Sequence, residues 1–389
     1  MEFTCELDSP PAMHGTRFGH QEWPLFQEQP RGMLVMSYHS NTDFERTSKK
    51  GLAIVDEPAR VIITFLRSFI LVTQLVPTHV CSDKVVLTTA VSYRPHAQLS
   101  ASDQNMDMQL HPYLEEPLDR LVKRIPELRG ISPAADQREL AMILQRTGTR
   151  VDEFFAGMVD VIGREEITQE RLVSTNVNGG MPGGTIQSKE RVRDSYLILR
   201  RADGTRAQIE EFRMDEKGNR MDRPGLDKGF FMTSGFALSS VHFSSALQWD
   251  SRFLHLGDQK IGERDTYVIA FAQLPSEARN TVTMEGQGGV KVHMFTQGIA
   301  WIDKANFQIV QMRTDLLAPR PEIGLAEQTT EITFGEVRFA DVPIPLWLPR
   351  DVSVYIKFTS AAPIQVFHNA HHYGDYRRFR VSTKILTPN

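Results

Sequence analysis

The chain has 389 residues, enough for one large domain or two ordinary ones. Hydrophobic residues make up 41% and charged residues 24%, which excludes a wholly disordered or membrane-embedded chain, and a formal net charge of -4 argues against nucleic-acid binding. The two cysteines, Cys5 and Cys81, lie in the first quarter, so a disulfide framework and a cysteine-based metal site are excluded.

The first 114 residues lack the hydrophobic period of a folded domain. We expect residues 1–59 to be a disordered or mis-assigned N-terminal extension. Residues 60–82 place two arginines around the start of an apolar run and small residues after it, the layout of a secretory signal peptide. If they act as one, the protein is periplasmic or otherwise exported, and residues 83–114 are a flexible leader. A buried strand or helix is the alternative, and the run is too short for a transmembrane span.

Two helices are predicted at the start of the remaining domain, 115–389. The first has apolar residues at i, i+3, i+4 and i+7 from Leu118 to Ile125 and ends near Pro126. Ser132-Pro133 is typical of a helix start, so the second helix is expected to begin there and to continue to Met158. Gly148 in its middle allows a kink or a break into two helices.

From residue 165 the apolar period changes to two, which predicts strands over 166–174, 192–201 and 206–214. Asp203-Gly204 is a strong hairpin turn between the last two. The Gly-rich stretch 177–189 precedes a strand and not a helix, so we interpret it as a mobile hairpin tip and not as a phosphate-binding loop.

Residues 222–249 interrupt the strand pattern. Ser234 is placed to cap a helix over the residues that follow it. Just before and after it lie four aromatic or methionine side chains, which make adaptable contact surfaces: Phe230, Phe231, Met232 and Phe236. We expect this loop to plug or line an apolar space; ordinary core beneath a crossover loop is the alternative.

Seven more strands are predicted, over 251–260, 265–273, 290–303, 307–317, 327–339, 351–359 and 364–381. The apolar phase switches at Gly335, which indicates a bulge or bend there. About ten strands that follow the helices predict an α+β fold with a curved antiparallel sheet.

Two of these strands are apolar on both faces, so both faces must be covered. Tyr267 and Phe271 lie on one face of the first, and Trp301 lies on the second. Helices, a neighbouring chain or a bound apolar ligand could provide the cover. These three residues, with the four of the 222–249 loop, are the candidate lining of an apolar ligand site.

Residues 251–272 and 298–317, which include parts of these two strands, resemble consecutive strands of periplasmic LolA/LolB/RseB-type domains. The residues that match the motif of that family are Gly257, Gly262, Arg264, Tyr267, Val268, Ile269, Gly298, Trp301, Ile302, Asp303, Ile309 and Val310. The arginine expected after Val310 is displaced to Arg313, and the whole of 115–389 resembles large exported bacterial proteins of this kind. The resemblance implies an unclosed β-barrel wrapped around the N-terminal helices. It also implies a concave apolar face that holds lipid or lipoprotein acyl chains.

Residues with catalytic or metal-binding chemistry do not form a recognisable site. Three histidines, at 368, 371 and 372, lie near Asp375, but on a strand His371 faces away from the other two, so we expect no metal. Glu165-Glu166 and Glu210-Glu211 each split across the faces of a strand, so an acid/base pair needs partners from different strands. His242 lies near several serines without an acid partner. We expect no cofactor.

Three functions remain in view. The first is a non-enzymatic envelope protein that binds a lipid or a lipoprotein acyl chain. The second is an interaction or sensor domain whose sheet is covered by a protein partner at the cell envelope. The third is a hydrolase, which three convergent polar side chains in a cleft would favour.

Overall fold

The computed structural model describes residues 2–7, 86–88, 112–173, 185–203, 206–221, 225–227, 230–233, 235–278, 282–285, 290–359 and 364–384. All of them belong to one compact unit, 1–34 with 84–389. The signal-peptide segment 60–82 lies outside the described residues, as do most of the extension, the leader and the Gly-rich tip. The boundaries expected for those segments therefore stay predictions.

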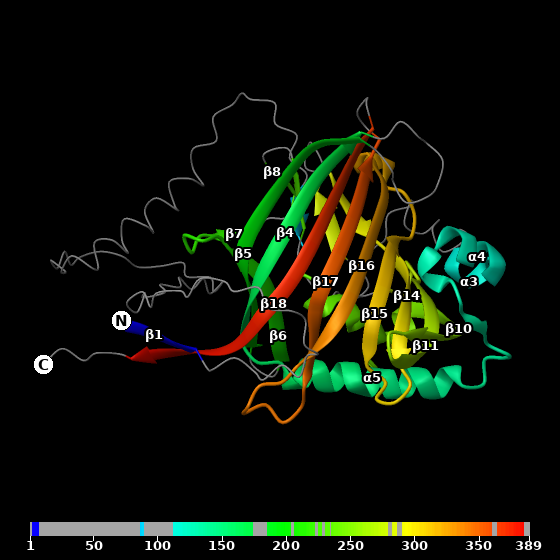
Figure 1. The fold of residues 1–389 in the computed structure, drawn as a ribbon, viewed down its shortest axis with the longest axis horizontal. Coiled ribbons are helices and arrows are strands. Elements are labelled where there is room, and N and C mark those ends of the chain that lie inside the picture. Colours follow the sequence, from blue (N-terminus) through cyan, green and yellow to red (C-terminus); the bar gives the residue numbers. More distant parts are fainter. Residues whose placement is uncertain are drawn as a thin grey trace, which may run out of the picture. The chain divides into compact units, whose positions relative to one another are not determined.

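Thirteen of the described strands form one antiparallel sheet, the main sheet (Figure 1). Its order is β3 (Ser132–Pro133), β10 (Ser251–Ile261), β11 (Arg264–Gln273), β14 (Thr296–Asp303), β15 (Ile309–Leu316), β16 (Leu325–Val337), β17 (Leu346–Phe358), β18 (Gln365–Lys384), β4 (Val161–Val173), β5 (Thr185–Asp203), β6 (Arg206–Met214) and β7 (Arg220–Met221). β1 (Glu2–Leu7) pairs with the end of β18. The sheet is curved and open, with β3 and β7 at its ends, which confirms the predicted fold class.

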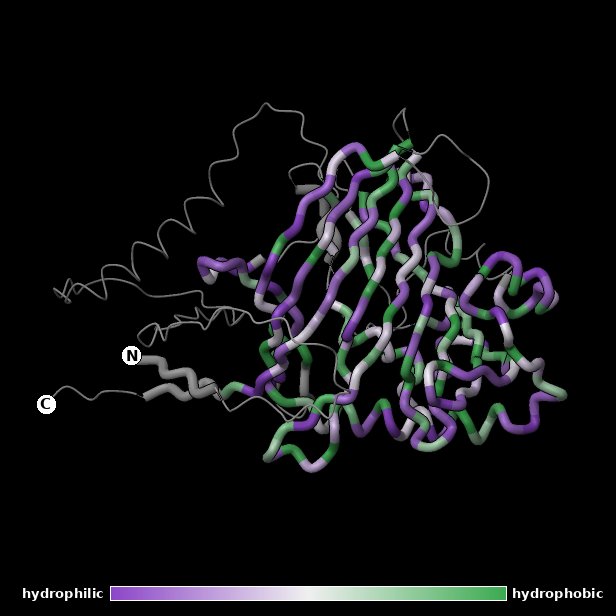
Figure 2. Tube along the Cα trace, viewed as in Figure 1, coloured by the Kyte–Doolittle hydropathy of each residue, from purple (hydrophilic) through white to green (hydrophobic). Residues whose placement is uncertain are grey.

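Strand register gives the main sheet two faces. Because partners in register point to the same side, Phe271, Gly298 and Thr314 share one face, which we call the inner face. Val268 and Trp301 share the other, the outer face. Along the strands in Figure 2, hydrophilic and hydrophobic residues alternate, as expected when one face is buried more completely than the other.

Helices lie on both faces. α5 (Leu140–Gly157) and the 3-10 helix η2 (Ala237–Phe243) cover the inner face, where the Phe243 ring lies 5.4 Å from that of Phe271. α3 (Pro112–Glu115), α4 (Leu118–Arg124) and η1 (Pro126–Leu128) cover the outer face. There Gln259 donates from Nε2 to the carbonyls of Glu127 and Arg129 at 2.8 and 2.9 Å. The sheet is therefore wrapped around α5 and not around all of the described N-terminal helices.

A small second sheet contributes to the same core. Its order is β13 (Lys291–Met294), β12 (Val282–Glu285), β2 (Val86–Thr88), β8 (Gly225–Asp227) and β9 (Phe230–Met232). The predicted strand 290–303 is wrong as a single element, because it divides at Phe295 into β13 and β14. Phe295 packs instead in a separate small core with Ala318.

Two further expectations about the helices are corrected. Ser132-Pro133 does not start a helix; it forms β3 at the edge of the main sheet, a place where a residue without an N–H is tolerated. Gly148 does not divide α5, which is continuous. A side chain there would meet Gln248 Nε2 at 2.6 Å, so the glycine lets the helix approach the chain segment around residue 248 closely.

Most strand predictions are confirmed with shifted ends. β6 has the predicted bounds, while β4 begins five residues earlier than expected and β17 begins at Leu346. The bulge predicted at Gly335 lies next to it, because the register shifts between Thr333 and Phe334. The remaining 3-10 turns within the described residues are η3 (Gln248–Asp250) and η5 (Pro321–Ile323).

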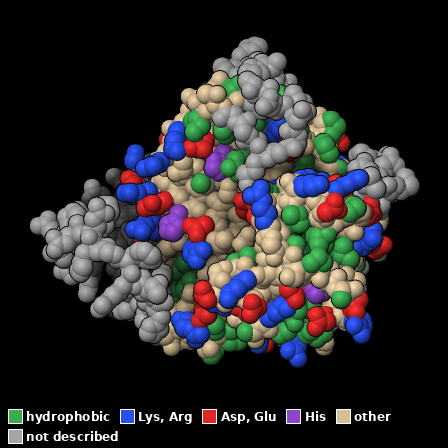
Figure 3. All heavy atoms as spheres, turned by 45° about the vertical axis from the view of Figure 1, so that its right-hand side comes forward, with side chains coloured by type: hydrophobic (Ala, Val, Ile, Leu, Met, Phe, Trp, Pro, Cys, Tyr) green, Lys and Arg blue, Asp and Glu red, His purple; other side chains and the backbone are tan. Residues whose placement is uncertain are grey.

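The outer face of β17, β18, β4 and β5 carries several charged pairs. Lys189 pairs with Glu170 at 2.7 Å, and His372 pairs with Asp351 at 2.7 Å. Figure 3 shows acidic and basic side chains interspersed over the surface it displays. Such pairs keep a strand face soluble and contribute little to stability.

Candidate functional site

The residues of the family-like motif have structural roles. Gly298 lies under the Phe271 ring, which a Cβ on residue 298 would meet at 2.7 Å. Gly262 has a positive φ of 59° in the turn between β10 and β11. Asp303 pairs with Arg264 and accepts a hydrogen bond from the backbone N–H of Ala305 at 2.7 Å, so it is a turn residue.

The turn between β14 and β15 contains an aromatic residue in the left-handed conformation, Phe307, with φ 60°. The Phe307 ring stacks on Tyr267 with centroids 6.0 Å apart, and the Arg146 guanidinium of α5 lies 4.9 Å from its centre. These contacts hold an aromatic residue in a backbone conformation that such residues rarely adopt.

Three of the candidate lining residues do not come together. Trp301 is fully buried on the outer face, where its Nε1 donates to Gln259 Oε1 at 2.8 Å. Tyr267 and Phe271 lie on the inner face, where the Phe271 ring is covered by Phe243 of η2 and by Phe253. One pocket cannot be lined by all three, because the sheet itself separates them.

The other candidates lie on the segment that crosses the inner face. Phe230, Phe231 and Met232 form β9, and the Phe230 side chain is buried. The side chains of the next two lie outside what the structure describes. Phe236 precedes η2 and places its ring 5.2 Å from His371 of β18. We call residues 230–243, with Ser234 outside the described part, the cross segment.

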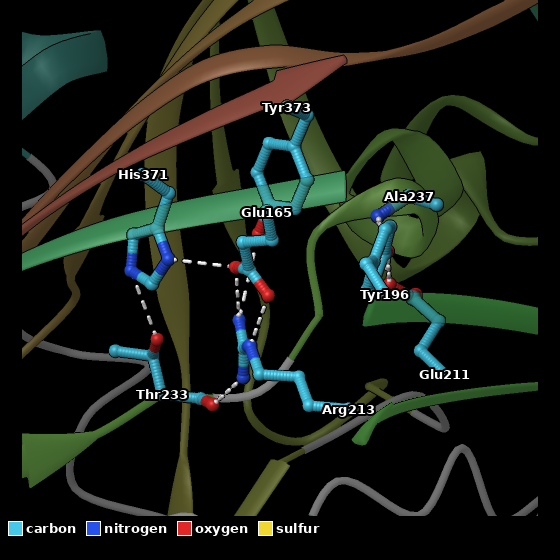
Figure 4. Close-up of polar contacts among 8 residues, drawn as sticks. All are labelled: Glu165, Tyr196, Glu211, Arg213, Thr233, Ala237, His371 and Tyr373. Carbon is cyan, nitrogen blue, oxygen red and sulfur yellow. Dashed lines mark hydrogen bonds and ion pairs between the residues drawn. The ribbon is translucent and has the colours of Figure 1, made fainter. Parts of the chain in front are cut away.

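A buried polar network fastens the cross segment to the main sheet (Figure 4). Glu165 of β4 pairs with Arg213 of β6, with Nη2 and Oε1 2.8 Å apart, and accepts from His371 Nδ1 at 2.8 Å. Arg213 also donates to the backbone carbonyl of Thr233, and the Thr233 hydroxyl lies 3.1 Å from His371 Nε2. Arg213 and His371, which both bind Glu165, thus hold Thr233 of the cross segment in place.

A second anchor lies beside the first. Glu211 accepts hydrogen bonds from the backbone N–H groups of Ala237 and Leu238, both at 2.9 Å, and one from the Tyr196 hydroxyl. It therefore caps η2, whose first residues have no cap of their own. Gly235 makes this approach possible, since a Cβ there would overlap the Glu211 carboxylate.

Burial and pairing set the charges of this network. Burial raises the pKa of Glu165, but Arg213 and His371 lower it more, and it lies at about 2. Burial lowers the pKa of His371, against the opposing effect of Glu165, so the imidazole is neutral at pH 7. Its Nδ1 carries the proton that Glu165 accepts, and Nε2 therefore accepts from the Thr233 hydroxyl.

The Thr233 hydroxyl, the His371 imidazole and the Glu165 carboxylate are connected in the same order as the catalytic groups of hydrolases that use a serine nucleophile. The arrangement is not in a cleft, because Thr233 is 7% exposed and Glu165 and His371 are fully buried or nearly so. Glu165 is also neutralised by Arg213, which weakens its support for an imidazolium. We therefore assign the network to holding the cross segment, not to catalysis.

A separate ionic cluster joins η1 to the outer face. Arg313, the displaced arginine of the motif, contacts Asp315 at 3.0 Å, Glu331 at 2.6 Å and Glu127 of η1 at 3.4 Å. Tyr113 of α3 donates to Asp315. Burial and the adjacent Glu127 raise the pKa of Glu331 to about 8.

The histidines of β18 lie as predicted. His371 faces inward, while His368 and His372 face outward and contact different carboxylates, those of Glu170 and Asp351. Among the described residues, no group of three or more metal-type ligands converges. His242 of η2 contacts the Phe271 ring, and burial lowers its pKa to about 4.

Sequence reasoning identified the pairs Glu165-Glu166 and Glu210-Glu211 but not the network they enter. The predicted split of each pair across the two faces of its strand is confirmed. Glu165 and Glu211 point to the inner face, and Glu166 and Glu210 point to the outer face. The sequence does contain a signal for this network. In β6, Glu211 and Arg213 alternate in step with the apolar Ile209, so all three side chains point to the same face. Charged residues on the inner phase of a strand indicate a buried polar network.

No helix in the part of the chain that the structure describes is long and apolar enough to cross a membrane. No protein-family model matches the chain, and no curated protein matches it.

Solved structures do match. One is an outer membrane lipoprotein-sorting protein domain from Vibrio parahaemolyticus, at 12% identity, covering 62% of this chain and 93% of that one, with a TM-score of 0.30. A DUF1329 family protein from Desulfovibrio piger matches at 10% identity over 61% and 92%, with a TM-score of 0.29. LolA superfamily protein NE2245 from Nitrosomonas europaea matches at 10% identity over 60% and 93%, with a TM-score of 0.26.

Proposed function

We propose that the protein binds an apolar ligand, a lipid or an acyl chain, between the inner face of the main sheet and its cover, without catalysing a reaction. The cover is the cross segment together with the hairpin β12–β13. The observation that carries the proposal is the apolar, methionine-rich face of that hairpin. Val282, Met284, Val292 and Met294 occupy one phase of the two strands, and residues of the opposite phase, such as Thr283, are polar.

The main sheet supplies the facing wall. Inner-face residues of β15 to β18 belong to the same hydrophobic core as the hairpin: Met312, Ile332, Val354, Ile356 and Phe367. Methionine and other aliphatic side chains can repack around a chain-like ligand at low cost. The cross segment is held by polar anchors at Thr233 and Ala237 as well as by the apolar packing of Phe243, and we propose that its first part, before η2, yields to a ligand.

The proposed lining differs from the seven residues expected from the sequence. Phe230 and Phe236 keep a place on the cover. Tyr267 stacks on Phe307, Phe271 packs against η2, and Trp301 lies on the other face, so we propose no ligand contact for these three.

The test is lipid extraction from protein purified without detergent, followed by mass spectrometry, together with uptake of a fluorescent fatty acid. We expect stoichiometric apolar material and saturable uptake. The variant Met294→Trp fills the space between the sheets and should reduce uptake about tenfold or more. Its matched control is Thr283→Trp, on the polar face of the same hairpin. Empty protein without saturable uptake, or equal effects of both variants, would overturn the proposal.

A further inference from the structure

The inner face carries more negative than positive side chains where it meets the cross segment. Three carboxylates point inward from neighbouring strands: Glu165 of β4, Asp194 of β5 and Glu211 of β6. Arg213 is the guanidinium among them. Glu165 is matched by that guanidinium, and Glu211 by two backbone amides and the Tyr196 hydroxyl.

Asp194 is the carboxylate without such a match. It is 5% exposed, and its Oδ2 is buried with no hydrogen-bond partner. A buried carboxylate without a protein donor is costly, because the hydration that it loses on folding is not replaced by the protein. Arg213 attracts it but is paired with Glu165, which leaves room for a proton or a cation from outside the chain to compensate Asp194.

We propose that Asp194 is the counter-ion for the primary ammonium head group of an amphiphile whose chain lies on the inner face; this rests on the proposed function. An ammonium offers three donors and one charge, which suits a carboxylate with a free oxygen. Val192 and Ile167 form the next residue pair along the same face, so Asp194 lies beside apolar side chains.

The charges that face Asp194 favour a cation. Glu165 comes from β4 and Arg213 from β6, and Asp215 and Glu216 lie in the turn after β6. From β18, His371 and Tyr373 reach Glu165, and both are uncharged at neutral pH. The sum of these groups, with Asp194 ionised, is negative. Burial and the proximity of Glu165 raise the pKa of Asp194 to about 6, so the carboxylate is available above that pH.

The test compares three probes of equal chain length on the full chain by calorimetry at pH 8: dodecylammonium, dodecanol and dodecanoate. We expect dodecylammonium to bind about tenfold more tightly than dodecanol, the gain of one charge-assisted hydrogen bond. The substitution Asp194→Asn should remove that preference and leave dodecanol binding unchanged. Glu216→Gln removes the same charge from an exposed turn and should keep the preference. At pH 5, where Asp194 is protonated, the preference should fall in the unsubstituted protein.

The possible outcomes separate the two proposals. Equal binding of all three probes overturns the role of Asp194 and leaves apolar binding intact. Absence of saturable binding by any probe overturns both. Competition by butylammonium as strong as that by dodecylammonium would show an ammonium site that does not need the chain, which contradicts an amphiphile. A preference that survives in Asp194→Asn places the head group elsewhere.

Discussion

At the scale of single residues, Asp194 makes the stability of the protein depend on pH. Its folded pKa, about 6, lies above its ordinary value, so its stabilising contribution is complete at low pH and is lost as the pH rises through 6. Asp194→Asn should therefore raise the free energy of unfolding at pH 8 by about 1 to 3 kcal/mol and change it little at pH 4. Urea unfolding at both pH values measures this, with Glu216→Gln as control. A gain of the same size at pH 4 would contradict the assignment.

Gly298 is a second residue whose role can be measured alone. A Cβ at this position would overlap the Arg313 carbonyl and the Phe271 ring. Because one of these neighbours is backbone, we expect Gly298→Ala to cost about 1 to 3 kcal/mol in chemical unfolding. Gly335→Ala is the control, since its nearest neighbour is an Arg350 side-chain carbon at 3.7 Å. Equal stability of the two variants would refute the close packing.

At the scale of elements, the contact between α5 and η2 depends on Gly148. Alanine normally stabilises the interior of a helix by about 1 kcal/mol relative to glycine. Here the added methyl group would meet Gln248, Ser245 and the backbone carbonyl of Phe243 at the end of η2, so Gly148→Ala should instead lower stability by about 1 to 3 kcal/mol. Gly157→Ala at the end of the same helix meets no atom within 4 Å and should be neutral or better. Stabilisation by both substitutions in thermal unfolding would mean that α5 and η2 are not in close contact.

The cross segment is held by charge pairing, which makes a double-mutant cycle informative. Arg213→Met leaves the buried Glu165 carboxylate without its guanidinium and should cost about 3 to 5 kcal/mol. Adding Glu165→Gln removes that charge and should recover a large part of the loss. Hydrogen exchange at Ala237 and Leu238 should accelerate in both variants, because each lacks the Arg213 anchor at Thr233. Additive losses in the double variant would argue against direct pairing.

For the whole described unit, shared packing predicts cooperative unfolding. The helices of both faces, the main sheet and the hairpin β12–β13 contribute to one hydrophobic core. Far-ultraviolet circular dichroism reports the strands and near-ultraviolet dichroism reports buried aromatic residues such as Trp301 and Trp347. We expect their thermal midpoints to coincide. Two separated transitions would show that a layer unfolds by itself.

The sequence by itself determined the order of elements and the class of the fold. Hydrophobic periods of 3.6 and of two depend on neighbours in the chain, so α4, α5 and β6 could be read directly. The change of phase near Gly335 likewise revealed a local bulge. Ser132-Pro133 was misread because its pairing partner, Gly257, lies more than a hundred residues away and no local signal marks it.

Only the tertiary structure decided which faces meet. The alternation of side chains assigns Tyr267 and Trp301 each to one face of its own strand, but it does not say which faces of neighbouring strands coincide. The pairing register decides that, and it puts the two residues on opposite sides of the sheet. The network of Glu165, Arg213 and His371 is likewise spread over three strands whose order in the sheet differs from their order in the chain. Pairing between distant strands is a property of the folded sheet, and the candidate site is built from such pairings.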